Sequence, residues 1–386
     1  MSLVAADPRL ARLLCAALLL SACATPGPVV VTPSPTPEGG VLTVSALLDL
    51  SNERSPGGGA QRDALALWIE RNASTGIPVR LDVVDVGGSE ARLALELHRA
   101  VVERHADAVI VGTAAALTIF GFGALAEAAR VPILLTLPAP EPSDLDGGRW
   151  IFALAPTHAD LAAAALADAE LRGVLEFSVY LALERDAADP ERDAFEDELD
   201  RRAGRRVIGV RYEPSPDAQP LVAAYLALAP SAHVLARPRD HTPLADAIRA
   251  SGTDALVYLS YLTDHAELGD LRAADIRSLW PSARRLVTPS AGSAGAGFVA
   301  AYAQRHGAPT AHAASAYDAL SLLAEAAAAV GADDPALLRD RLERSTFAGV
   351  VTTYRFRADR HAGFDPADIA FVRWGGDAPV PAGLLR

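Results

Sequence analysis

Short apolar runs alternate with helix-like patterns along most of the chain. Val41–Leu48 and Ala108–Gly112 are apolar runs of strand length. Between such runs, apolar residues recur every three to four positions, as Leu93, Leu97 and Val101 do. Because alternating buried strands and amphipathic helices are typical of βαβ units, the pattern predicts a doubly wound α/β domain with a parallel sheet.

The same rhythm restarts after Ala155, which predicts a second doubly wound domain. Helices are predicted over 63–72, 89–104, 112–130, 158–172, 190–203, 218–229 and 243–251, and further strands over 79–86, 133–135, 177–183, 207–212, 233–236 and 255–259. Two such domains account for the length of 386 residues.

The last hundred residues are less regular. Helices are predicted over 298–305, 313–330 and 334–344, and the second is so rich in alanine and leucine that we expect it to be buried. Two late strands, Val350–Phe356 and Ile369–Trp374, have no helix between them. We therefore expect both to be antiparallel additions to an existing sheet.

The first forty residues have a different pattern. Two arginines precede the apolar run Leu13–Leu20, which is far shorter than a membrane span, and small residues then lead to Cys23. This resembles the lipobox of bacterial lipoproteins, which predicts a signal peptide over 1–22 and an acylated Cys23. An ordinary secretory peptide, or an apolar N-terminus without a sorting role, is the alternative. Prolines make 23–40 an extended tether.

Composition narrows the function classes. Without residues 1–22 the chain carries 33 basic and 47 acidic residues, a balance opposite to that of a nucleic-acid binder. Cys15 and Cys23 are the only cysteines, so the body has no thiol nucleophile, disulfide or thiolate metal site. The nine histidines are scattered and form no His-Glu-x-x-His pattern. We expect no catalytic activity, no metal and no cofactor.

Several short segments, in this order, carry a family resemblance. They are Ala64–Asn72, Val83–Asp85, Val109–Gly112, Val131–Ile133, Phe298–Tyr302, Ala316–Leu320, and Phe347–Gly349 continuing to Arg355 and Phe356. The chain from Val41 to Pro381 resembles type I periplasmic substrate-binding proteins, specifically the branched-chain amino-acid (Leu/Ile/Val) binding family of ABC importers.

The resemblance implies two Rossmann-like lobes joined by three hinge crossovers, which close around a ligand. The first lobe would comprise 41–154 plus 289–345 and the second 155–288 plus 346–386, with hinge strands near Ala153, Val287 and Val351. It also implies a monomer that delivers a small molecule, an amino acid or a related carboxylate or amide, to an ABC permease. With the lipid, the protein would lie at the cell envelope, facing the periplasm or the outside.

Members of this family that bind amino acids grip the carboxylate with hydroxyls and N–H groups on two loops. On the first loop, 112–116, the family's serine falls on Ala116, and on the second, 136–141, its threonine falls between Ala139 and Glu141. Both hydroxyls are missing here. A lost hydrogen bond to a buried carboxylate costs about 1.5–3 kcal/mol, so the two missing hydroxyls argue against an ordinary amino-acid ligand.

Other residues are candidates for ligand binding at the same place. They are Ser51, Asn52 and Arg54 after the first strand, Thr113, Thr136 and Glu141 on the two loops, and Arg237, Arg239 and Tyr261 after strands of the second lobe. Arginine pairs suit a carboxylate or phosphate, a tyrosine can stack on a ligand, and Glu141 suits a cation. The alternatives are solvated arginines paired with Asp240, a core role for the nearby Tyr258, and an exposed helix-start carboxylate at Glu141.

Two functions fit these observations. The first is a solute receptor for an ABC importer. The second is a docking or regulatory envelope lipoprotein that keeps the fold with a degenerate cleft. The missing hydroxyls favour the second, whereas the hinge topology and the acidic surface favour the first.

Overall fold

The protein is described from a computed structural model. It describes residues 40–51, 57–72, 76–117, 121–142, 148–174, 176–182, 189–202, 206–212, 232–235, 250, 252, 256–263, 277–375 and 378–382, all of which belong to one unit, Pro37–Arg386.

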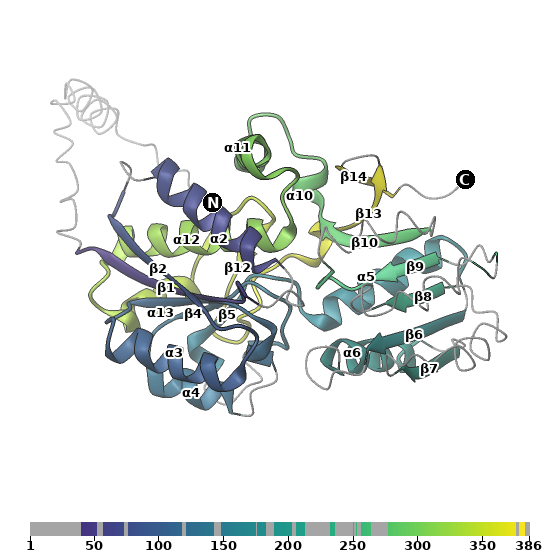
Figure 1. Cartoon of the computed structure of the whole chain (residues 1–386), viewed down its shortest axis with the longest axis horizontal. Helices are drawn as coiled ribbons and strands as arrows, with labels where there is room; N and C mark the ends of the chain where they lie inside the picture. Colours follow the sequence, from purple (N-terminus) through teal and green to yellow (C-terminus); the bar gives the residue numbers. More distant parts are fainter. Residues whose placement is uncertain are drawn as a thin grey trace, which may run out of the picture. The chain divides into compact units, whose positions relative to one another are not determined.

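The first sheet has five parallel strands in the order β2-β1-β3-β4-β5 (Figure 1). Its strands are β1 (Leu42–Leu48), β2 (Val79–Asp85), β3 (Ala108–Gly112), β4 (Ile133–Leu135) and β5 (Ile151–Ala153). Strand order reverses at β1, which is the arrangement of a doubly wound sheet. The predicted strands β3 and β4 have the bounds expected from the sequence, because each is a short apolar run between turn residues.

Helices cover both faces of this sheet. They are α2 (Gly58–Asn72), α3 (Glu90–Val102), the 3-10 helix η1 (Ala114–Leu117), α4 (Phe122–Ala129), α12 (Ala311–Val330) and α13 (Pro335–Glu343). Leu42, Val44 and Ala46 of β1 face one hydrophobic core, with α2 and α12, whereas Leu47 and Val109 face another, with α3 and α4. The alternation along β1 is the period-two pattern of a strand buried on both faces.

Helix α12 lies in the centre of the first core, as its composition predicts. Thr310 caps its N-terminus by accepting the N–H of Ala313. Among the described residues it is the one helix long and apolar enough to cross a membrane, and 61% of that apolar window is buried inside the protein. Trp68 of α2 donates to the Ser321 hydroxyl of α12 at 2.7 Å, which ties the two helices together.

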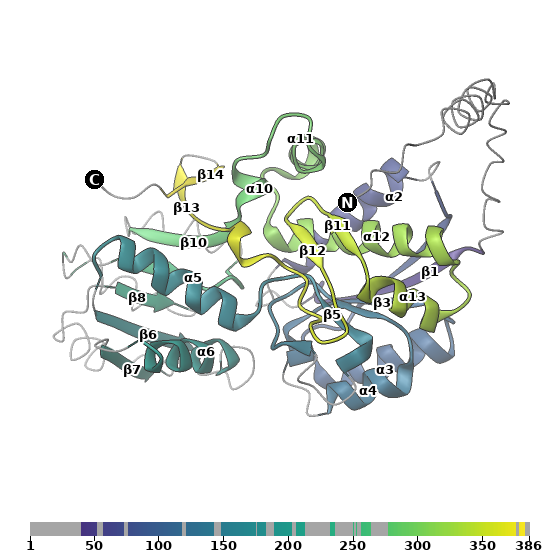
Figure 2. The same cartoon turned by 180° about the vertical axis from the view of Figure 1, so that it is seen from behind.

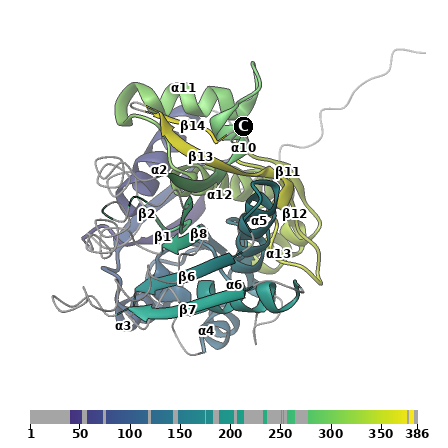
Figure 3. The ribbon, with the colours of Figure 1, turned by 90° about the vertical axis from the view of Figure 1, so that its right-hand side faces the viewer.

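The second sheet has seven strands in the order β14-β13-β10-β9-β8-β6-β7. They are β6 (Glu176–Ala182), β7 (Arg206–Tyr212), β8 (Ala232–Leu235), β9 (Leu256–Leu259), β10 (Ser278–Ala283), β13 (Ile369–Gly375) and β14 (Ala378–Pro381). The pairs from β7 to β10 are parallel. The strands β13 and β14, which lie together at one end of the sheet (Figure 3), are antiparallel. The prediction that Ile369–Trp374 extends an existing sheet is therefore confirmed.

Two helices share a core with the second sheet, α5 (His158–Leu171) and α6 (Asp189–Asp200). A capping box starts α5, in which Thr157 and Asp160 each accept the other's backbone N–H. We call the first sheet with α2, α3, α4, α12 and α13 the first lobe, and the second sheet with α5 and α6 the second lobe. The sequence boundaries drawn for the two lobes stay a prediction.

Two expectations for the segments between the lobes, and one for the first lobe, are wrong. Val287 ends a short helix, α10 (Arg284–Val287), instead of lying in a hinge strand. The strand of this region is β10, which ends at Ala283, before Val287. The sequence did not predict β10 because it contains Pro281. Strand β12 (Thr353–Arg355) pairs only with β11 (Thr346–Ala348) in a sheet of their own (Figure 2). In the first lobe, where one helix was expected after Gly112 and up to about Arg130, the described residues form the 3-10 helix η1 and the helix α4.

The end of the chain returns to the first sheet after β12. The N–H of Ala153 donates to the carbonyl of His361 at 2.9 Å, and the N–H of Gly363 donates to the carbonyl of Ala153 at 3.0 Å. The last residue of β5 is thus held by the segment that leads into β13. Two of the connections between the lobes are therefore bonded to each other.

A buried carboxylate fixes the turn between β11 and β12. Asp318 of α12 accepts the N–H groups of Val350 and Val351, at 2.8 and 3.2 Å, and the Tyr354 hydroxyl at 3.1 Å. Burial raises the pKa of Asp318 to about 7, against the effect of these three donors. The core helix of the first lobe therefore holds the chain near the predicted hinge at Val351.

Candidate functional site

Three loops meet at one edge of the first sheet. Leu48 pairs with Gly112, and Val111 pairs with Leu135, so the carboxyl ends of β1, β3 and β4 lie together. This brings to one edge the loops that carry the first-lobe candidates Ser51, Thr113, Ala116, Thr136, Ala139 and Glu141. Ligands of open parallel sheets bind at such an edge.

The loop after β1 is organised by an aspartate. Asp85, at the end of β2, accepts N–H groups from Leu50, Ser51 and Gly87 at 2.9, 3.2 and 3.0 Å. Ser51 itself is exposed. Its backbone is thereby fixed, and its hydroxyl is also hydrogen-bonded to the Asp85 carboxylate, which helps to lower the pKa of Asp85.

The hydroxyl of Thr113 is already engaged inside the first lobe. It donates to Oδ2 of the buried Asp49 at 2.8 Å and accepts the N–H of Ala115 at 3.1 Å. Asp49 also accepts the N–H of Gly88 at 2.6 Å. Because a hydroxyl has one hydrogen to donate, Thr113 fastens the loop to β1 instead of offering a donor to a ligand.

The hydroxyl of Thr136 is engaged in the same way. It donates to Oε1 of the buried Gln61 at 2.6 Å, and Gln61 in turn donates from Nε2 to the carbonyl of Gly112 at 3.3 Å. Sequence reasoning missed Asp49 and Gln61. The available signals were an acidic residue directly after an apolar strand and a polar residue on the buried face of a helix.

The loops themselves present apolar atoms. Ala116 and Ala139 are 5% and 1% exposed, and they pack in the core beside α3 and α4. Ala114 and Leu137 of these loops form a small cluster with Leu262, which follows β9 in the second lobe. The two lobes therefore touch through apolar side chains next to the positions of the missing hydroxyls.

Glu141 connects the second loop to the returning chain. Its Oε1 accepts the N–H groups of His361 and Ala362, at 2.8 and 3.0 Å. The carboxylate thus bonds to the same segment that holds Ala153. Glu141 therefore lies at the junction of both lobes, where it fixes the backbone of the returning chain.

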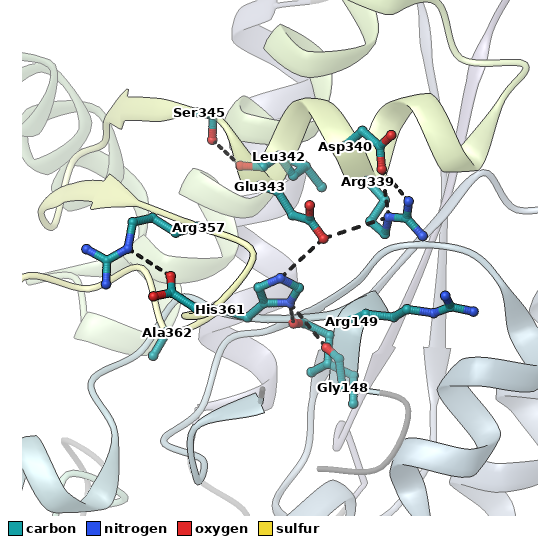
Figure 4. Close-up of polar contacts among 12 residues, drawn as sticks. Gly148, Arg149, Arg339, Asp340, Leu342, Glu343, Ser345, Arg357, His361 and Ala362 are labelled. Carbon is teal, nitrogen blue, oxygen red and sulfur yellow. Dashed lines mark hydrogen bonds and ion pairs between the residues drawn. The ribbon is translucent and has the colours of Figure 1, made fainter. Parts of the chain in front are cut away.

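The ring of His361 anchors this junction (Figure 4). Its Nδ1 lies 2.9 Å from the carbonyl oxygen of Ile151 and 3.2 Å from that of Gly148, so Nδ1 carries the hydrogen. The opposite nitrogen, Nε2, lies 3.5 Å from the Glu343 carboxylate of α13. The ring also stacks on Phe152 with 4.5 Å between centroids. His361 is a structural link that sequence reasoning missed.

Tyr258 in β9 and Tyr261 just after it have different surroundings. Tyr258 belongs to the core of the second lobe, where its hydroxyl donates to Asp168 at 2.8 Å. Tyr261 is buried against the first lobe, edge to face with His312 of α12 at 5.1 Å. Within the described part of the chain its hydroxyl has no hydrogen-bond partner, and burial raises its pKa.

A cavity of about 440 Å³ has walls from both lobes. Pro140 and Glu141 come from the loop after β4, the segment 157–160 from the start of α5, and Arg360 from the returning chain. The remaining wall is one face of α6. The volume lies within the usual range of small-molecule sites.

His158 is the unusual residue of this cavity. It is only 4% exposed, and neither ring nitrogen has a hydrogen-bond partner among the residues that the structure describes. Burial lowers its pKa to about 4, because the charged imidazolium is disfavoured away from water. The ring is therefore neutral at pH 7 and presents one N–H donor and one lone pair.

Five predicted residues lie outside the described part of the chain. They are the lipid-attachment residue Cys23 and the ligand candidates Asn52, Arg54, Arg237 and Arg239. Their roles stay predictions.

Comparisons with known proteins agree with this architecture. The family model for periplasmic binding proteins matches residues 41–378. The leucine-binding protein LivK from Thermotoga maritima superposes with a TM-score of 0.75 at 17% identity, over 89% of this chain and 99% of that one. LivJ from Streptococcus pneumoniae, in complex with isoleucine, gives 0.71 at 17% identity, over 88% and 98%.

A solute-binding protein of an ABC transporter from Rhodopseudomonas palustris, in complex with benzoate, gives a TM-score of 0.72 at 16% identity, over 89% of this chain and 96% of that one. No curated protein sequence matches the chain. Identities this low show the fold alone, whereas the family model covers most of the chain. The resemblance drawn from the sequence is confirmed: the chain belongs to the periplasmic binding protein family, has its type I fold, and is an extracytoplasmic protein.

Proposed function

We propose that this protein is the solute-binding component of an ABC importer, tethered to the membrane by lipid on Cys23. It holds a small ligand between its two lobes and releases it to the permease. The observation that supports this is the cavity whose walls come from Glu141 on one side and from α5 and α6 on the other. A ligand bound there contacts both lobes at once, which is what hinge closure requires.

The proposal includes no chemical step. The family is one of solute-binding proteins. Along the cavity wall the hydroxyl of Thr157 is used to cap α5, where it accepts the N–H of Asp160. Among the residues that the structure describes, no group of three His, Cys, Asp or Glu side chains could hold a metal ion.

A screen of ligands tests the proposal. The soluble form beginning at residue 24 is heated with amino acids, amides, amines, aliphatic and aromatic carboxylates and short peptides, and hits are titrated by calorimetry. A ligand at 100 times its Kd stabilises the folded state by about 2.7 kcal/mol. At least one class is expected to raise the melting temperature. If no compound in the panel raises the melting temperature, the proposal of a solute receptor is contradicted.

Lipid attachment has its own test. Cells fed an alkyne analogue of palmitate are expected to label the full-length protein, and Cys23→Ser is expected to abolish the label. Cys15→Ser, inside the predicted signal peptide, is the matched control and keeps it. A label that survives Cys23→Ser places the lipid elsewhere and overturns this part of the proposal.

One observation favours the second candidate function, a docking or regulatory lipoprotein. Ala114, Leu137 and Leu262 touch each other where a family ligand would meet the loops, and such a contact closes the lobes without a ligand. This alternative predicts no stabilisation by any small molecule in the panel. It also predicts that in-cell crosslinking captures an envelope protein other than a permease.

A further inference from the structure

A second cavity, of about 310 Å³, lies where the chain crosses from the second lobe back to the first. One wall contains Ser282 of β10 and Pro379 of β14, which belong to the second sheet. The opposite wall is formed by helix α11 (Ala294–His306) and the segment 307–309, and the short helix α10 completes the lining. Both Figure 1 and Figure 3 show α10 and α11 beside β14.

Helix α11 is fixed to the first lobe. The Tyr302 hydroxyl donates to the carbonyl of Ala60 in α2 at 3.3 Å, and Arg71 of α2 donates to the carbonyl of Gly297 at 3.0 Å. The cavity therefore has one wall from each lobe, and a rotation of the lobes about this crossover would change its shape. A molecule that fits the cavity in one arrangement of the lobes stabilises that arrangement.

The described lining of this cavity is apolar. Apart from Gly307 and Ser282, it consists of leucine, valine, alanine and proline side chains, and none of the described lining residues carries a charge. A charged ligand would lose its hydration here without gaining an ion pair, which is costly. The lining therefore favours a neutral molecule with a large apolar surface.

Ser282 supplies a second, independent indication of a ligand. It is 4% exposed and lines the cavity, and its hydroxyl has no hydrogen-bond partner among the described residues. The hydroxyl of Ser45 is also unpaired there, but it is sealed from solvent, whereas that of Ser282 is not. Leu279 of β10 packs with α5 and α6, so Ser282, three residues later, lies on the opposite face of the sheet, toward α11. An unpaired hydroxyl open to a cavity is available to a ligand.

The volume of the cavity sets the size of its ligand. An apolar cavity of about 150 Å³ holds one benzene molecule. A cavity of about 310 Å³ therefore accepts a body of about twice that size. Two fused rings with one hydrogen-bonding group match both the space and the single hydroxyl.

We infer that this cavity is a second binding site, for a neutral and mainly apolar molecule about the size of two fused rings, with one hydrogen-bonding group. That group bonds to Ser282, and the apolar body packs between α11 and β14. Binding at this site does not depend on the proposed function. Its effect on the lobes does, because a ligand that spans the crossover acts on the same hinge that closes the lobes.

Indole is the probe, because it is neutral, has two fused rings and carries one N–H that the Ser282 oxygen can accept. Calorimetry on the soluble form is expected to show binding of indole and of 3-methylindole, which is neutral and slightly larger. Indole-3-acetate and tryptamine add a negative and a positive charge, and each is expected to bind at least about tenfold more weakly than indole. No binding of indole, or tighter binding of either charged compound, overturns the inference.

Two pairs of variants locate the site. Ser282→Ala is expected to weaken indole about three- to tenfold and to leave the melting temperature of the ligand-free protein unchanged, because no bond within the described protein is lost. Ser278→Ala, on the same face of β10 outside the cavity, keeps the affinity. Ala303→Leu fills the cavity and is expected to abolish binding, whereas Ala300→Leu, exposed on the same helix outside the cavity, does not. Equal effects within either pair overturn the assignment of this cavity.

The chain's own C-terminus is the competing occupant. Residues 383–386 follow β14 and include Leu384 and Leu385. Indole binding by a form that ends at Ala382, together with no binding by the form that ends at Arg386, overturns the inference, because the C-terminal residues would then fill the cavity.

The effect on the lobes is measured with spin labels at Leu95→Cys on α3 and Leu171→Cys on α5. Saturating indole is expected to narrow the distribution of distances between them, and an unchanged distribution overturns the action on the hinge. The two proposals fail separately. Indole binding without a response to any compound of the ligand panel supports this site and contradicts the receptor, whereas a response in the panel without indole binding does the reverse.

Discussion

Replacing Gly349 by alanine tests how firmly the turn after β11 is fixed to the first lobe. A Cβ on Gly349 would lie 2.4 Å from Oδ2 of Asp318 and 2.7 Å from Cε2 of Tyr354. Both distances are below the closest approach of real Cβ atoms. Asp318 cannot retreat freely, because Val350, Val351 and Tyr354 all donate to it.

The expected loss follows from those bonds. Moving the carboxylate breaks two or three hydrogen bonds from buried donors, each worth about 1–3 kcal/mol when its partner is left unpaired. Alanine also restricts the unfolded chain, which returns about 0.4–1 kcal/mol. We therefore expect Gly349→Ala to lower the free energy of unfolding by about 3–5 kcal/mol.

Urea unfolding followed by circular dichroism measures this change. Gly297→Ala is the control, since that glycine is inside α11 (Ala294–His306) and a Cβ there has one neighbour, Nη2 of Arg71, at 3.7 Å. It is expected to be stabilising by about 0.5–1 kcal/mol. Equal stabilities of the two variants would refute the reasoning, because the crowding at Gly349 would then have no energetic consequence.

Three further predictions concern the same framework. Burial raises the pKa of Asp318 from its ordinary 3.8 to about 7, so between these values the folded protein keeps a proton that the unfolded chain releases. The free energy of unfolding should therefore fall as the pH rises from 4 to 7. Urea titrations measure this slope, and Asp318→Asn should flatten it. Thr113→Val removes the hydroxyl donor to Oδ2 of the buried Asp49 and should cost about 1–3 kcal/mol by urea unfolding, whereas Thr113→Ser should cost less. Gly58→Ala puts a Cβ 1.9 Å from the Asp49 carbonyl oxygen and should lower the melting temperature, whereas Gly59→Ala, with no atom within 4 Å, should not.

Much of the fold follows from local pattern in the sequence. β3 and β4 were predicted with their observed bounds because each is a short apolar run with turn residues on both sides. The strand β10 was not predicted because it contains Pro281, which has no N–H to donate within a sheet. In the structure Pro281 pairs with Phe371 of β13, and only Ser278 and Leu279 of β10 pair with β9. Strand partners, such as β11 for β12, depend on tertiary contacts that periodicity does not encode.

The sequence predicts where the candidate site lies better than it predicts what each residue there does. Parallel topology brings Thr113 and Thr136 to one edge, and the sequence indicates that much. It does not indicate that Asp49 and Gln61, from other elements, take up both hydroxyls. His158 was not predicted because its notable feature, two buried ring nitrogens without a hydrogen-bond partner among the described residues, appears only in the tertiary structure.

The central claim is that a ligand draws the two lobes together. The chain after Cys23 has no cysteine, so spin labels can be attached at Leu95→Cys on α3 and Leu171→Cys on α5, which are 47% and 72% exposed. Pulsed electron resonance measures the distance between them in the soluble form. We expect the strongest ligand of the screen to replace a broad distance distribution by a narrower, shorter one. An identical distribution with and without saturating ligand would contradict closure.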